Sequence, residues 1–128
     1  MSVSCGNDIV KVSRVKESIE RIGETFIKRV YTEEEIEYCE SRRMCKYQSY
    51  AVRFAAKEAV YKALSPGEDG FTSWQDVEVK RLENGKPVVH LSGGLAKYAS
   101  TKGIGDENIE ISLSHDDDYA IATAVIEY

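Results

Sequence analysis

Cysteine is scarce in this chain and is not arranged as a framework. The 128 residues hold three cysteines, Cys5, Cys39 and Cys45, with no CxxC pair and no histidine at ligand spacing. This pattern argues against a disulfide scaffold or a zinc site, so we expect free thiols in a reducing compartment. No apolar run approaches the ~18 residues of a membrane span, and MSVSCGNDIV lacks the features of a signal peptide. We therefore expect a cytoplasmic protein without a membrane segment.

Positive charge is also in deficit. The chain carries 17 Lys and Arg against 22 Asp and Glu, a net charge of −5, which argues against nonspecific nucleic-acid binding. It lacks a Walker GxxxxGK[ST] loop, a GxGxxG loop and a GxSxG elbow. The sequence therefore offers neither of the common glycine-rich loops for phosphate binding and no nucleophile elbow for serine catalysis.

The composition that remains is that of an ordinary globular protein, 42% hydrophobic and 30% charged. The length suits one core, and we predict a single domain over residues 1–128. Apolar spacing is helical in the first half and alternating after the loop at 65–70. The order β-α-α-α-β-β-α-β-β predicts an α+β domain with a mainly antiparallel sheet packed on a long central helix.

The first half is predicted to hold a strand within 3–12 that is broken at Gly6-Asn7-Asp8, one helix from 12 to 30, a helix from a capping box at Thr32 to about 42, and the central helix over 47–64. The second half is predicted to hold strands around 77–80 and 87–91, a helix N-capped by Ser92 that runs to about 101, and strands over 108–114 and 119–127.

The central helix contains RFAAKEAVYKAL at 53–64, which is nearly all apolar yet carries Glu58 and Lys62 one turn apart on one face. Two interpretations are open. The pair can lie at the surface, where it contributes ~0.3–0.5 kcal/mol, or it can line a cleft in which a metal and an anion satisfy both charges.

Asp8 and His115 are the other candidates for chemistry. Two carboxylates with a nearby lysine suit Mg²⁺ held jointly by protein and substrate phosphates. Spacing alone does not bring Asp8 to Glu58, since 50 positions separate them. His115 precedes three aspartates, a pattern that is also typical of a solvated turn.

A basic stripe marks the first predicted helix. Arg14, Arg21 and Lys28 recur every seven positions, which keeps them aligned on a helix to within roughly 20° per step. A solvated face interleaved with glutamates and a docking face for an acidic partner are both open.

Six collinear blocks of the chain resemble the holo-acyl-carrier-protein synthases, the short type of 4′-phosphopantetheinyl transferase. GNDIV at 6–10 resembles that family's G-x-D-I-[VT] start, and RVYTEEEIEY at 29–38 is similar to its R-[IV]-L-T-x-x-E segment. RFAAKEAVYKAL resembles the signature R-[FW]-A-A-K-E-A-x-x-K-A. SWQDVEV, NGKP and SLSH, at 73–79, 84–87 and 112–115, resemble later blocks in the same order.

The resemblance implies transfer of 4′-phosphopantetheine from coenzyme A to a serine of an apo acyl carrier protein, with adenosine 3′,5′-bisphosphate released, for fatty acid or polyketide synthesis. It implies that Asp8 and Glu58 hold Mg²⁺ and that Glu58 and Lys62 are catalytic, while the base could be Glu58, Asp8 or a metal-bound water. The implied coenzyme A contacts are Arg53, Lys62, Gly67, Pro87, Ser114 and His115.

The resemblance also implies partners. Arg14, then Arg21 and Lys28, would dock the acidic helix of the carrier protein, and a homotrimer would bind each coenzyme A between two subunits. No nucleic-acid or membrane partner is expected.

The chain departs from the family pattern in three places: Lys11 replaces an acid, Val52 replaces a glycine, and Ser65-Pro66-Gly67-Glu68-Asp69 replaces a G-T-G-x-G loop. Added negative charge near a polyphosphate is unfavourable unless it points away, so coenzyme A affinity or carrier preference could differ. A coenzyme-A-binding protein without turnover and an Mg²⁺-dependent phosphohydrolase are the rival interpretations.

Overall fold

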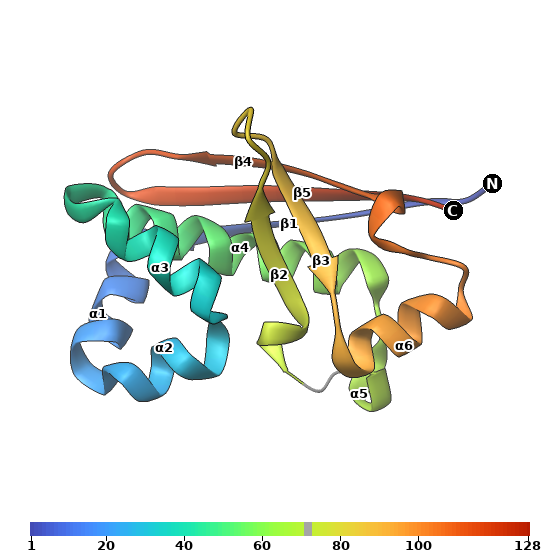
Figure 1. Cartoon of the computed structure of the whole chain (residues 1–128), viewed down its shortest axis with the longest axis horizontal. Helices are drawn as coiled ribbons and strands as arrows, with labels where there is room; N and C mark the ends of the chain where they lie inside the picture. Colours follow the sequence, from blue (N-terminus) through green and yellow to red (C-terminus); the bar gives the residue numbers. More distant parts are fainter. Residues whose placement is uncertain (71–72) are drawn as a thin grey trace.

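The computed structural model describes residues 1–70 and 73–128 (Figure 1). Its strands and helices appear in the predicted order, except that the first predicted helix is divided in two and a short helix follows the central one. The strands are β1 (Val3–Lys11), β2 (Val77–Arg81), β3 (Pro87–Leu91), β4 (Ile109–His115) and β5 (Tyr119–Glu127). The helices are α1 (Val12–Ile22), α2 (Glu24–Val30), α3 (Glu33–Ser41), α4 (Lys46–Leu64), α5 (Gly67–Gly70) and α6 (Gly93–Thr101). Short 3-10 turns occur at η1 (Arg43–Cys45), η2 (Trp74–Asp76) and η3 (Asp106–Asn108).

Two antiparallel sheets organise the chain around α4. One has the strand order β1-β5-β4, and the other is the β2–β3 hairpin. Figure 1 shows the helices on one side of the three-stranded sheet, with α4 running beneath its strands and the hairpin crossing them. The predicted α+β class, with antiparallel sheet on a long central helix, is confirmed.

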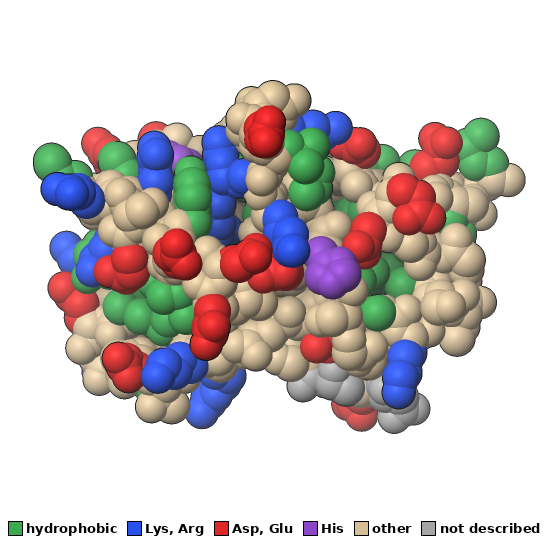
Figure 2. Space-filling model, in the orientation of Figure 1, with side chains coloured by type: hydrophobic (Ala, Val, Ile, Leu, Met, Phe, Trp, Pro, Cys, Tyr) green, Lys and Arg blue, Asp and Glu red, His purple; other side chains and the backbone are tan. Residues whose placement is uncertain are grey.

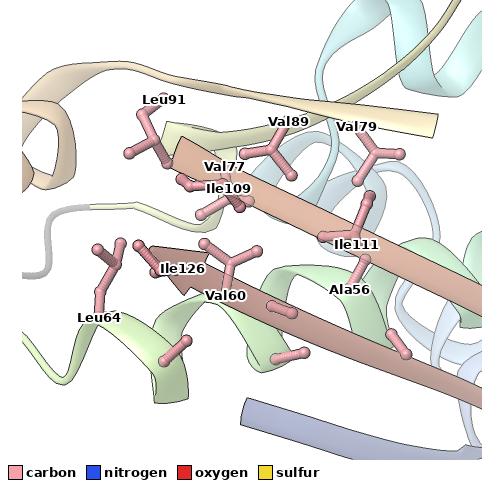
Figure 3. Close-up of a cluster of buried hydrophobic side chains, with 14 of the residues drawn as sticks. Ala56, Val60, Leu64, Val77, Val79, Val89, Leu91, Ile109, Ile111 and Ile126 are labelled. Atoms are coloured by element: carbon pink, nitrogen blue, oxygen red, sulfur yellow. The ribbon is translucent and has the colours of Figure 1, made fainter. Parts of the chain in front are cut away.

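Small side chains bring α4 close to the sheet. Ala55, Ala59 and Ala63 of α4 are buried, and so are the alternating residues Ala120 and Ala122 of β5. Larger side chains fill the space between α4, the hairpin and β4, as Figure 3 shows for Val60, Val77, Val79, Ile111 and their neighbours. This core fixes the position of α4, which carries the candidate site residues.

Strand β1 is continuous, contrary to the predicted break at Gly6-Asn7-Asp8. Gly6 lies inside the strand because nothing larger fits against α4: a Cβ there would lie 2.3 Å from Ala59 O and 2.8 Å from Ala63 N. Glycine in a strand often marks such a close backbone approach. The glycine that suggested a break therefore sets the spacing between β1 and α4.

The predicted single helix over 12–30 is wrong in one respect. Gly23 adopts φ 76° between α1 and α2, a conformation that other residues adopt rarely, so the apolar stripe continues across a break. The predicted loop at 65–70 also differs, since residues 67–70 form α5 after Ser65 ends α4 in the left-handed region.

The N-terminus of α6 is capped from a distance. Ser92 occupies the N-cap position, but its side chain makes no capping hydrogen bond, which corrects the prediction. The Asp76 carboxylate instead lies against Gly93 and accepts a hydrogen bond from the Leu95 backbone N–H at 3.4 Å. An acidic side chain at this end is also favoured by the helix dipole.

The capping box at Thr32 is confirmed, and it leads into a buried charge network. Glu35 accepts hydrogen bonds from the backbone N–H groups of Thr32 and Val79, at 2.9 and 2.8 Å. Its carboxylate also pairs with Lys57 Nζ at 2.7 Å, and both side chains are fully buried. Lys57 donates a further bond to Val77 O at 2.6 Å, which joins α3, α4 and β2.

Cys5, Cys39 and Cys45 are free thiols, as predicted. Along the part of the chain that the structure describes, no helix combines the length and hydropathy needed to cross a bilayer.

Candidate active site

Strand β1 and helix α4 bring Asp8 and Glu58 together across the Gly6 contact. Alternate residues of β1 face α4, and Asp8 is among them, held in register opposite Ala122 of β5. The Glu58 and Asp8 carboxyl groups are within hydrogen-bond reach of each other. The packing of β1 on α4 thus brings Asp8 and Glu58 together, which their separation in the sequence could not predict.

The pKa of Glu58 is raised above the usual value of a glutamate. Partial burial is the largest cause, because it penalises the charged form, and the neighbouring charge of Asp8 acts in the same direction. Lys62 offsets part of this increase. Two carboxyl groups held this close are stabilised by a shared proton or by a cation.

Lys62 pairs with Asp8 and not with Glu58. Its Nζ lies 3.1 Å from Asp8 Oδ1 and 3.0 Å from the backbone O of Asn7. Among the described residues no ion pair joins Lys62 to Glu58, so the simple i, i+4 surface pair is not formed. The lysine side chain remains 51% exposed, so its ammonium can reach an anion that approaches Asp8.

The donor set fits magnesium. Mg²⁺ in proteins typically uses one or two carboxylates and leaves its remaining positions to water and substrate phosphates. Within the described chain, no group of three or more metal-ligating side chains gathers, so a cation here would depend on Asp8 and Glu58 plus external oxygens. That is the magnesium pattern and not that of an all-protein cage.

A recess of about 490 Å³ opens beside the two carboxylates. Asp8, Lys11, Arg14 and Glu58 give it charge, and Phe54 of α4 contributes apolar surface with Val10, Val15 and Phe26. Lys11, one of the three expected departures from the family pattern, lies in the recess itself. The mixture of two carboxylates, two cations and an apolar wall suits a ligand with a charged group and an uncharged arm.

The basic stripe is shorter than predicted. Arg14 and Arg21 line a shallow hollow of about 680 Å³ on the exposed face of α1. Lys28 lies on α2 beyond the break at Gly23, where it pairs with Glu24 at 3.4 Å. The seven-residue spacing assumed one continuous helix, so it does not align Lys28 with the other two. Arg14 lines both the hollow and the recess with Asp8 and Glu58, as does the uncharged Ser18.

Arg53 and His115 lie in a second recess, of about 250 Å³. Arg53 and Glu58 are five positions apart on α4, so their side chains leave the helix in directions roughly 140° apart. Arg53 is 3% exposed and packs against α3, whereas Glu58 faces β1. One chain therefore presents its predicted site residues as two separate groups.

The remaining predicted coenzyme contacts lie at the edges of the fold. Gly67 begins α5 with φ 73°, Pro87 opens β3, and Ser114 precedes His115 at the exposed end of β4. As far as the structure describes the chain, these three residues line neither recess.

Sequence reasoning missed the arginine cluster of the second recess. Arg42 and Arg81 join Arg53 and His115 there, beside Tyr38. Figure 2 shows Lys and Arg side chains gathered beside the β2–β3 hairpin, on its α3 side. No spacing rule connects Arg81 of β2 to α3, but the nearly apolar surroundings of Arg53 in RFAAKEAVYKAL were a signal that its charge needs a partner.

The chain matches the model of the 4′-phosphopantetheinyl transferase superfamily over residues 4–124. It is 46% identical to the holo-[acyl-carrier-protein] synthase of Ruminiclostridium cellulolyticum, over 98% of this chain and 92% of that protein. It is 44% identical to the synthase of Solibacter usitatus, over 99% of each chain.

Solved structures agree with this match. The Neisseria meningitidis synthase superposes with a TM-score of 0.84 at 30% identity, covering 98% of both chains. The Helicobacter pylori synthase in complex with coenzyme A gives 0.81 at 30% identity, covering 96% of this chain and 99% of that one. Fold and site therefore define a transferase of the phosphopantetheinyl class. Within that class, this chain belongs to the holo-acyl-carrier-protein synthase family.

Proposed function

We propose that residues 1–128 form one 4′-phosphopantetheinyl transferase domain that modifies an apo acyl carrier protein with coenzyme A and Mg²⁺. The observation that carries this proposal is the meeting of Asp8, Glu58 and Lys62 at one recess. Two carboxylates and one lysine, with no strong nucleophile, suit a reaction in which positioning and charge neutralisation do most of the work.

In the proposed reaction, the carrier's serine oxygen forms a bond to the phosphorus that bears pantetheine. The bond from that phosphorus to adenosine 3′,5′-bisphosphate breaks, and the serine proton passes to a base. Mg²⁺, when bound, supplies charge neutralisation at the pyrophosphate. No oxidant or further co-reactant is needed.

Glu58, Asp8 and a metal-bound water are the candidates for the base that accepts the serine proton. Without metal, burial and the charge of Asp8 raise the pKa of Glu58, and a cation bound between the two carboxylates would oppose that shift. Lys62, held at Asp8 with half of its side chain exposed, is placed to contact a phosphate oxygen.

The second recess supports a site shared between subunits. The positive charge of this recess comes from Arg42, Arg53 and Arg81, and it lies away from the carboxylates. A neighbouring chain is therefore the simplest source of both groups at one ligand. The outer face of the three-stranded sheet offers an apolar contact for such a neighbour, because Val3, Ile9 and Ile121 are 64%, 61% and 44% exposed. We propose a homotrimer in which Arg53 and His115 of one subunit bind the phosphate monoester of coenzyme A.

Carrier docking is proposed for Arg14, Arg21 and Lys28. Arg14 has the strongest support because it lines both the α1 hollow and the recess of Asp8 and Glu58. A carrier bound along α1 would deliver its serine to the carboxylates, and complementary charge would orient it.

The transfer is tested by incubating the protein with apo carrier, coenzyme A and Mg²⁺ and measuring the intact mass of the carrier. The expected result is a gain of one phosphopantetheine per carrier, with an equal amount of adenosine 3′,5′-bisphosphate. Coenzyme A that binds but is never transferred to any carrier would favour a binding protein. Release of the bisphosphate without a carrier would favour a phosphohydrolase.

A further inference from the structure

The second recess is unusual in its charge. Arg42, Arg53, Arg81 and His115 line it, and no carboxylate is among its described lining residues. An adjacent furrow of about 490 Å³ shares Arg53 and Arg81 but includes Glu34 and Glu37. A dianion is therefore favoured in the recess and not in the furrow.

The three arginines meet at one aromatic ring. The guanidinium carbons of Arg53, Arg81 and Arg42 lie 4.2, 5.2 and 5.7 Å from the centroid of Tyr38. All three fall within the range of a cation–π interaction. They come from α4, β2 and the end of α3, so Tyr38 connects elements that are distant in sequence.

These cations lack carboxylate partners. None of the ion pairs within residues 1–70 and 73–128 involves an arginine. Arg53 is also 97% buried, and its Nε has no hydrogen-bond partner in the described structure. A buried polar atom without a partner is costly, and an anion in the recess would remove part of that cost.

We propose that Tyr38 is a positioning residue that holds Arg53 and Arg81 toward a phosphate monoester, and that Arg81 contacts this phosphate directly. The inference rests on the proposed function, since coenzyme A carries one such group, its 3′-phosphate. A phosphate monoester is close to a dianion at neutral pH, which matches a recess of three guanidinium groups better than a singly charged diester would.

The test compares Tyr38→Leu, which removes the ring, with Tyr38→Phe, which keeps it. With coenzyme A, Tyr38→Leu is expected to raise the coenzyme KM about tenfold while kcat and the carrier KM stay within twofold. Tyr38→Phe is expected to match the unmodified protein. With 3′-dephospho-coenzyme A, all three proteins are expected to be equal.

If Tyr38→Leu raised the KM for coenzyme A and for 3′-dephospho-coenzyme A by the same factor, the proposal would be overturned, because Tyr38 would then have a structural role only. A Tyr38→Phe protein as impaired as Tyr38→Leu would also overturn it. Arg81→Gln is the second variant, and its expected defect is likewise confined to the coenzyme with the 3′-phosphate. Lys86→Gln at the hairpin tip removes an equal charge outside the recess and is expected to change neither KM.

Equilibrium binding separates this inference from the proposed function. Adenosine 3′,5′-bisphosphate is expected to bind the unmodified protein more tightly than adenosine 5′-monophosphate does, and Tyr38→Leu is expected to remove the difference. This result would hold even if no carrier were modified. Equal binding of the two nucleotides to the unmodified protein would refute the phosphate site, whatever the outcome of the transfer assay.

Discussion

Lys57 Nζ lies 2.7 Å from Glu35 Oε1, and neither side chain is exposed to solvent. Burial lowers the pKa of Lys57, and the charge and hydrogen bond of Glu35 counter that effect. The pair joins α3 to α4, and Lys57 directly precedes Glu58 in the chain. Because Glu35 also accepts backbone hydrogen bonds from Thr32 and Val79, the loss of one partner disturbs three elements at once.

Lys57→Met is expected to lower the free energy of unfolding by about 3–5 kcal/mol, since it leaves the Glu35 carboxylate buried without its cation. Urea unfolding followed by circular dichroism measures the change. Lys97→Met on the exposed face of α6 is the matched control and should stay within about 0.5 kcal/mol. A Lys57→Met protein as stable as the control would show that the buried pair does not stabilise the fold.

Gly6→Ala is expected to weaken both the fold and the metal site. The new Cβ would collide with Ala59 O and Ala63 N, which forces β1 away from α4 at a cost of about 1–3 kcal/mol. Asp8 moves with the strand, so Mg²⁺ affinity measured by calorimetry should fall. Cys5→Ala, on the opposite face of β1, serves as the control. Unchanged Mg²⁺ affinity in Gly6→Ala would show that the spacing between β1 and α4 does not determine metal binding.

Glu58→Gln is expected to abolish transfer and yet raise the melting temperature at pH 8 without metal. The pKa of Glu58 is raised in the fold, so its ionised form costs stability above that pKa. The cost disappears as the pH falls below the usual glutamate value of 4.5, so the two melting temperatures should converge there. A less stable variant at pH 8 would contradict this account.

The same variant tests the metal. At 100 times its Kd, Mg²⁺ should add about 2.7 kcal/mol to the unfolding free energy of the unmodified protein. Glu58→Gln should gain much less. Metal binding should also weaken as the pH falls through the raised pKa of Glu58, because a protonated carboxyl group is a poor ligand. If Mg²⁺ stabilised both proteins equally, Glu58 would not be a ligand of the metal.

Arg14→Glu is expected to raise the carrier KM by at least tenfold while leaving the coenzyme A KM within twofold, because it reverses charge where α1 meets the recess. Steady-state kinetics with each substrate varied in turn gives both values. Lys97→Glu makes the same charge change on α6 and should affect neither. Equal increases in the two KM values would argue against docking along α1.

Mixing two inactive variants tests whether sites are shared between subunits. Glu58→Gln and Arg53→Met are each expected to be inactive alone. In trimers assembled at random from equal amounts of the two chains, about a quarter of all sites would combine an intact carboxylate pair with an intact arginine from the neighbouring chain. Transfer should therefore recover to about a quarter of the unmodified rate. No recovery in verified mixed trimers would place both groups in one subunit.

Local signals predicted much of this fold. Thr32 and Glu35 form the capping box that their spacing indicated, and Val77 and Val79 alternate into the core as expected. The errors arose where tertiary contacts decide. Gly6 was interpreted as a break because the residues around it in the sequence do not indicate that α4 packs against it. The Asp76 carboxylate caps α6 by accepting a hydrogen bond from Leu95, which is 19 positions away in the sequence.

The candidate site shows the same division. Glu58 and Lys62 were identifiable from one helix, but Asp8, rather than Glu58, proved to be the partner of Lys62. Arg81 could not be predicted at all, since only the packing of the hairpin against α3 brings it to Tyr38. Periodicity describes a face of one element and does not indicate which other element will cover it.

The strand order β1-β5-β4 places β1 at the edge of its sheet, with Asp8 opposite Ala122. Asp8 is therefore synthesised long before the strand that fixes its position. Such long-range pairing is slow to form, so a growing chain can carry Asp8, Glu58 and Lys62 without yet having a site. The Asp8 side chain is held in place only when β1 pairs with β5, so the site depends on a strand that is synthesised much later than the residue it positions.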